Sequence, residues 1–117
     1  MFLFLMATVG LNAQNQEEMG QFNYAYNLYS GGDGQSAVNH LNQYINSFNS
    51  SPGYWLGDAG HIEFVFRVYG LAITILADSG NSGGADQYLD QLVYLMSDIY
   101  YESDVINAYN STYIGPY

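Results

Sequence analysis

The sequence predicts an all-α fold, with four main helices arranged as two antiparallel helical hairpins and an extended or helical apolar N-terminal segment. Apolar residues recur at spacings of three and four along four stretches, which is the pattern of amphipathic helices. Glycine-rich breaks separate these stretches, so consecutive helices are expected to be antiparallel neighbours. The length of 117 residues suits one domain, which we assign to residues 15–117, after an apolar segment at 1–14.

The first helix is predicted at about residues 15–30. Asn15 stands at the N-cap position and Glu18 follows three residues later, which is the spacing of a capping box. Glu17 and Glu18 then lie near the positive end of the helix dipole. Its apolar stripe consists of Met19, Phe22, Ala25, Tyr26 and Tyr29.

The second helix, at about 35–49, has the most regular apolar stripe. Val38, Leu41, Ile45 and Phe48 follow one another at spacings of three, four and three. The glycines of SGGDG precede this stretch and separate it from the first helix. We therefore expect this stripe to face the core.

The third helix is predicted to begin after a capping Asp58 and to run to about Asp78. Apolar residues occupy every side of it, so it must be covered on all sides. Glu63 precedes Arg67 by four positions, the favourable order for an ion pair on a helix. We therefore predict that the chain's only Lys or Arg forms a local pair with Glu63.

The fourth helix is predicted at about 84–101, after the loop DSGNSGG, with Ile99 among its inward-facing residues. A short turn at 104–109 and a tyrosine-rich tail follow it. The predicted core over all the helices comprises Val38, Leu41, Ile45, Phe66, Ile73, Leu89, Leu92 and Met96.

The first hairpin, AYNLYSGGDGQSAVNHLNQYINSFNSSP, resembles a tetratricopeptide-type unit. Ala25 and Leu28 match the small and large positions of its first helix, and GD marks the turn. Ala37, Leu41 and Tyr44 match the small, large and contact positions of its second helix. The closing proline comes a few residues late, and the second hairpin has an inserted loop. The resemblance implies stacked helix pairs with a concave groove for partner proteins.

The composition excludes some partners and favours others. One basic residue against eleven acids gives a net charge of -10, which repels nucleic acid and anionic lipid. Charged residues make up only 10% of the chain, while aromatic residues reach 17%. Such a surface suits a subunit that packs against copies of itself, because proteins that stay free in solution normally carry mixed surface charges that prevent association.

The apolar N-terminal stretch FLFLMATVGL has two interpretations. It has the length of the apolar region of an export signal, and LNAQ at its end offers a small residue as a cleavage site would, but no basic residue precedes it. Alternatively, the segment is retained and packs against protein. It cannot span a bilayer, since a helix needs about twenty apolar residues for that, so we expect no membrane span.

No motif predicts catalysis, a cofactor or a metal centre. His61-Ile62-Glu63 matches part of a zinc-deaminase signature, but the chain has no cysteine to supply the rest. His40 stands alone, so we expect both histidines to be solvated or to cap helices. GGDGQS lacks the final acid of a calcium-binding repeat, and no G-x-S-x-G motif is present. We expect a protein that is not an enzyme.

These features together favour a structural subunit of an extracellular homopolymeric assembly, a filament or fibril held by head-to-tail packing. The alternative is a secreted repeat-type helical protein-binding module. In the assembly, the apolar segment docks on a neighbouring copy, and the outer face of the third helix is a candidate receiving surface. The expected interface residues are Phe2, Leu3, Phe4, Leu5, Met6, Tyr54, Trp55, Tyr113 and Tyr117.

Two Asn-x-Ser/Thr sequons bear on the extracellular expectation. Asn49 and Asn110 each begin such a triplet, beside a turn-like segment where a glycan can be accommodated. If the chain is exported, we expect both residues to be exposed and available for an N-linked glycan.

Overall fold

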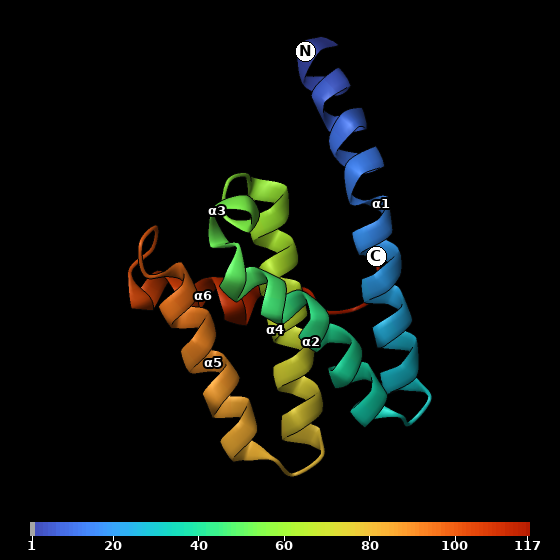
Figure 1. Ribbon diagram of the computed structural model, residues 1–117, viewed down its shortest axis with the longest axis vertical. Helices are drawn as coiled ribbons and strands as arrows, with labels where there is room; N and C mark the ends of the chain where they lie inside the picture. Colours follow the sequence, from blue (N-terminus) through green and yellow to red (C-terminus); the bar gives the residue numbers. More distant parts are fainter. Residues whose placement is uncertain (1) are drawn as a thin grey trace.

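The computed structural model describes the backbone of residues 2–117 and the side chains of residues 16–117. Over residues 2–117 the chain forms six helices and no strand, which confirms the all-α fold class (Figure 1). The helices are α1 (Phe2–Ser30), α2 (Gly34–Ser50), α3 (Pro52–Trp55), α4 (Ala59–Asp78), α5 (Ser82–Met96) and α6 (Glu102–Ser111).

Helix α4 lies at the centre of the packing. It contacts each of the other five helices that the structure describes. α1 packs along α2 and α4 packs along α5, with a short turn joining the members of each pair. α2 also packs against α4 and so connects the two pairs. In Figure 1 the tail after α6 runs back to α1, where the chain ends.

Short polar side chains mark the starts of three helices. Asp33 accepts a hydrogen bond from the backbone of Ser36 at 3.1 Å, and Asp58 caps α4 in the same way. Asn81 accepts from the backbone of Gly84 at 2.9 Å. Each cap satisfies a backbone N–H that would otherwise lack a partner in the first turn.

The core forms where the predicted apolar stripes meet. Every predicted core residue is buried except Leu89, which is half-buried. Residues 64–73 of α4 are all buried, because helices of this same chain surround them. Over residues 64–73 the third predicted helix is therefore covered within the chain, so this stretch does not provide the receiving surface that we expected.

Helix boundaries differ from the prediction in three places. α1 begins at Phe2 rather than near residue 15, so residues 2–14 belong to its backbone. α5 ends at Met96, and the expected turn at 104–109 is part of α6. Ile99 thus lies in the connection between α5 and α6, where it is 45% exposed rather than inward-facing.

Candidate functional site

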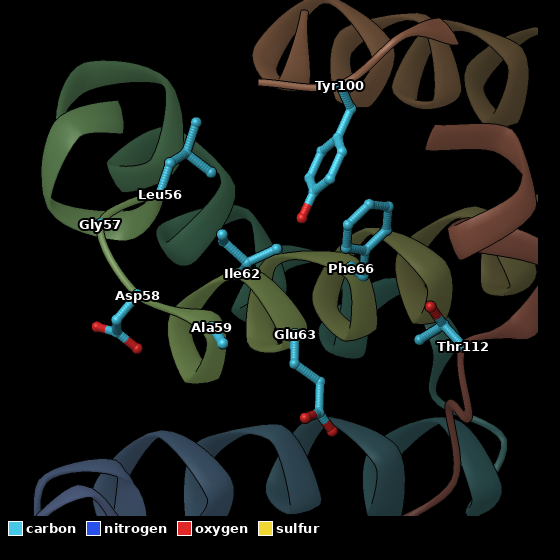
Figure 2. A pocket seen from close by; sticks show the side chains of 9 residues that line it. All are labelled: Leu56, Gly57, Asp58, Ala59, Ile62, Glu63, Phe66, Tyr100 and Thr112. Carbon is cyan, nitrogen blue, oxygen red and sulfur yellow. The ribbon is translucent and has the colours of Figure 1, made fainter. Parts of the chain in front are cut away.

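A cleft of about 460 Å³ lies between α4, the loop before it, and the turn that joins α5 to α6 (Figure 2). Leu56, Ile62 and Phe66 give it an apolar wall. Tyr100 comes from the turn after α5, and Figure 2 shows its ring pointing toward Ile62 and Phe66. The cleft therefore combines aliphatic and aromatic groups at the surface.

Local structure holds these groups in place. Ile62 and Phe66 are four residues apart on α4 and so lie on the same face of the helix. The backbone N–H of Tyr100 donates to the carbonyl of Met96 at 2.9 Å, which closes the turn that carries the ring. Capping by Asp58 fixes where α4 begins, beside the cleft.

Only acids carry charge among the residues that line the cleft. Asp58 and Glu63 both contribute to its lining, whereas no Lys or Arg does. In Figure 2 their carboxylates point away from Tyr100, so they lie at the edge and leave the apolar wall free. A group bound in the cleft would thus meet an apolar surface with negative charge beside it.

An acid–histidine–acid cluster around the buried His61 lies next to the cleft. His61 is 2% exposed, and its Nδ1 lies 2.7 Å from Oδ2 of Asp58. Its Nε2 lies 3.7 Å from Oε1 of Glu18, which comes from α1. The His61 ring also contacts the rings of Tyr54 and Trp55, with centroids 4.9 and 5.1 Å away. The cluster therefore links α1 to the start of α4.

Burial changes the acidity of Glu18. Desolvation raises the pKa of its carboxyl above the ordinary value of 4.5, although His61 lowers it in part. The second carboxylate oxygen, Oε2, is buried and has no hydrogen-bond partner.

The expectation of a solvated or capping His61 is wrong, because the His61 side chain is buried. The available signal was its position three residues after Asp58, where its backbone N–H receives the cap.

Arg67 does not pair with Glu63, and our prediction of that ion pair is wrong. It is 5% exposed, and its Nη2 donates to the carbonyl of Gly115 at 2.5 Å. The guanidinium carbon lies 3.6 Å from the centre of the Tyr117 ring and 5.4 Å from that of Tyr113. The tail after α6 folds over α4 and supplies these groups, which spacing along the helix could not reveal.

The ring of Tyr117 meets Arg67 as a neutral group. Burial raises its pKa to about 12, although Arg67 lowers it in part. At neutral pH the contact is therefore between a cation and an aromatic face, which stabilises the guanidinium without a counter-charge.

The residues proposed for an interface lie in different environments. Tyr54, Tyr113 and Tyr117 are 55%, 65% and 43% exposed. Trp55 is only 6% exposed, since it packs against Phe48 and Phe64 within the core. The structure brings Tyr113 and Tyr117 together around Arg67, and Tyr54 and Trp55 together beside His61. The side chains of Phe2, Leu3, Phe4, Leu5 and Met6 lie outside the described residues.

Both sequons lie at the surface, and the side-chain amide of Asn49 already takes part in hydrogen bonds. Both asparagines are exposed and lie near the ends of helices, Asn49 in α2 and Asn110 in α6. Nδ2 of Asn49, the atom that would carry a glycan, donates to the carbonyl of Ile45 and to the hydroxyl of Tyr69. A glycan at Asn49 would compete with these two hydrogen bonds.

Two further features concern metals and membranes. Among the described side chains no group of three or more His, Asp or Glu residues could hold a metal ion. His40 instead places its Nε2 2.7 Å from Oε1 of Gln21 on α1. Within the part of the chain searched, α4 is long and apolar enough to cross a membrane, yet 67% of that stretch is buried here, and core helices meet the same criteria.

Comparison with known proteins adds no assignment: no family model matches the sequence, and neither a curated protein nor a solved structure is significantly similar to it.

Proposed function

We propose that this chain is a helical protein-binding module that takes an apolar partner segment carrying basic side chains in the cleft beside α4. The α1–α2 and α4–α5 pairs act as two helical hairpins that hold the cleft residues in place, as in a repeat-type module. In this proposal the chain performs no catalysis and acts outside the cell.

The observation that carries the proposal is the chemistry of the cleft. Its wall combines Leu56, Ile62 and Phe66, and Tyr100 is 41% exposed beside them. Aromatic and aliphatic groups in a surface cleft are the usual anchors for a partner side chain, because they lose water on contact. Catalysis has no comparable support, since the hydroxyl of Thr112, which also lines the cleft, donates to the carbonyl of Ala108 rather than to a base.

The electrostatics favour a basic partner. Asp58 and Glu63 lie at the edge of the cleft, and the chain carries a net charge of -10. Its only Lys or Arg is buried under the tail and does not line the cleft. A basic segment would be drawn to the edge, and its association rate would fall as salt screens the attraction.

The test uses a fluorescein-labelled amphipathic peptide of alternating Leu and Lys pairs, with binding followed by fluorescence anisotropy. Tyr100→Ala should weaken binding by about tenfold, as for a typical aromatic anchor. Tyr94→Ala is the matched control, because Tyr94 is 81% exposed and does not line the cleft. Glu63→Gln should weaken binding at low salt and make it less salt-dependent.

Two outcomes would contradict the proposal. One is equal loss of binding in the Tyr100→Ala and Tyr94→Ala variants, which would place the peptide elsewhere. The other is equally tight binding of a Leu–Glu peptide of the same pattern, which would show that the acidic edge selects nothing.

A second candidate function is the structural subunit of an extracellular homopolymer. It is favoured by the run FLFLM, which belongs to the 29-residue helix α1. Figure 1 shows the first half of this helix running beyond the ends of the other helices. A helix end with that composition needs a second surface, and a neighbouring copy would provide one. Under this proposal the partner is another copy of the chain.

A further inference from the structure

The tail after α6 is bound to the helices through a few specific contacts, mainly those of its aromatic side chains. Residues 113–117 form no helix, and they cross to α1 (Figure 1). The backbone N–H of Tyr117 donates to Oδ1 of Asn23 on α1 at 2.7 Å. Its ring meets the ring of Phe22 edge to face, with the centroids 5.4 Å apart. This hydrogen bond and this ring contact join the tail to α1, in addition to its contacts with Arg67 on α4.

Gly70 leaves room for this tail on α4. A Cβ atom at this position would lie 2.8 Å from Cγ2 of Ile114, which is closer than real side chains approach. The absence of a side chain therefore lets Ile114 pack against the helix. Gly70 lies three residues after Arg67, so both face the same tail from neighbouring turns.

Arg67 depends on the tail for most of its partners. One aromatic contact comes from a helix: the guanidinium carbon of Arg67 lies 4.8 Å from the centre of the Phe22 ring on α1. Tyr113, Gly115 and Tyr117 all come from the tail. A cation next to apolar helices is costly unless it has partners, and the tail supplies them as two aromatic faces and one carbonyl.

The tail does not use the full capacity of the site. Nε of Arg67 is buried and has no hydrogen-bond acceptor. Much of Tyr113 and Tyr117 remains exposed. The segment STYIGPY contains no charged residue, so a copy of it can approach despite the acidity of the chain.

We propose that Arg67, Phe22, Asn23 and Gly70 form a docking site for a short aromatic segment, and that the 113–117 segment of a second copy of this chain can replace the resident one. Every contact of the closed form is remade between copies in the exchanged form, which is why such exchange has a low free-energy cost. This site is separate from the cleft, and the inference stands whether or not the cleft binds a basic segment.

The first test measures the site with a labelled, C-terminally amidated peptide, NSTYIGPY, added to the full chain. Tyr117→Ala weakens the resident segment, so the peptide should bind this variant at least about tenfold more tightly than the unaltered chain, in which the tail competes. A peptide with both tyrosines changed to alanine is the matched control and should not bind. No binding to a Tyr117→Ala chain that keeps its helical circular dichroism would overturn the site, as would equal binding of the control peptide.

The second test asks whether a second copy is the partner. Tyr117→Ala keeps the site and damages the segment, whereas Arg67→Gln keeps the segment and damages the site. Each variant alone should stay monomeric, and their mixture should give a heterodimer by native mass spectrometry, where the two masses differ. A mixture of folded variants that stays monomeric would overturn the exchange between copies.

If Arg67→Gln loses its helical circular dichroism, Gly70→Ala replaces it in the mixture. Its new methyl group displaces Ile114 and so damages the site without removing the cation. The expected and contradicting outcomes stay the same.

Discussion

Glu18, His61 and Arg67 are the polar side chains that the structure buries among residues 16–117. Different neighbouring groups offset the cost of burying each of these side chains. Arg67 has aromatic faces and one carbonyl, and His61 has a carboxylate on either side. Burial leaves one oxygen of Glu18, Oε2, without a hydrogen-bond partner, and desolvation raises the pKa of its carboxyl. Charge at Glu18 should therefore oppose folding.

The pH dependence of stability follows from this residue. Burial raises the pKa of Glu18 in the folded chain above 4.5, so the folded state holds this proton more tightly than the unfolded state does. Stability from this group is present at low pH and is lost as the pH rises through the folded pKa. Glu18→Gln should therefore become more stable relative to the unaltered chain as the pH rises above 4.5, as measured by urea unfolding.

Glu17→Gln is the control for this experiment, because Glu17 is adjacent and exposed. Its unfolding free energy, relative to the unaltered chain, should change less over the same pH range. A stability difference for Glu18→Gln that shrinks with rising pH would contradict the argument.

At the scale of the elements, the turns decide where helices end. Gly32 and Gly80 have φ angles of +92° and +84°. These angles lie in the left-handed region, which residues with a Cβ atom enter at a cost. Each glycine follows one helix and precedes the cap of the next, so the turns between α1 and α2 and between α4 and α5 depend on them.

Two glycine substitutions should have opposite signs. Gly32→Ala should lower the free energy of unfolding by about 1–2 kcal/mol, because alanine is strained at that φ. Gly20→Ala should raise it by about 0.5–1 kcal/mol, since alanine favours a helix more than glycine does. Gly20 lies within α1, and a Cβ there would meet no atom within 4 Å. Urea unfolding measures both, and equal signs would contradict the assigned backbone.

For the whole molecule, net charge and apolar surface act in opposite directions. The chain has a net charge of -10, so copies repel one another at low salt. The run FLFLM favours association in water, because it carries no polar group to compensate. Which of the two dominates decides between the module and the polymer.

Deleting residues 2–13 tests the polymer directly. If the apolar segment joins copies, the shortened chain should keep its helical circular dichroism and lose all higher assembly. Light scattering would then report a single mass below the 13.0 kDa of the full chain. A shortened chain that still forms polymers would show that this segment does not hold them together.

The helical class, the buried stripe of α2 and the cap of α4 could be predicted from the amino-acid sequence. These features depend on residues within a few positions of one another, so periodicity and side-chain type are enough to predict them. Leu41 and Ile45 are buried as their spacing predicts, and Asp58 caps the helix that its position predicts.

The partners of the buried polar groups and the surroundings of α4 depend on long-range packing and could not be predicted from the sequence. Arg67 contacts the ring of Tyr117, which lies 50 residues further along the chain. His61 lies beside the carboxylate of Glu18, which belongs to another helix. Spacing on one helix cannot report such contacts, because they depend on which chain segments meet in space. Spacing along the helix therefore predicted Glu63 as the partner of Arg67. In the folded chain the tail is the partner instead, because its aromatic faces cover the cation within the packed structure.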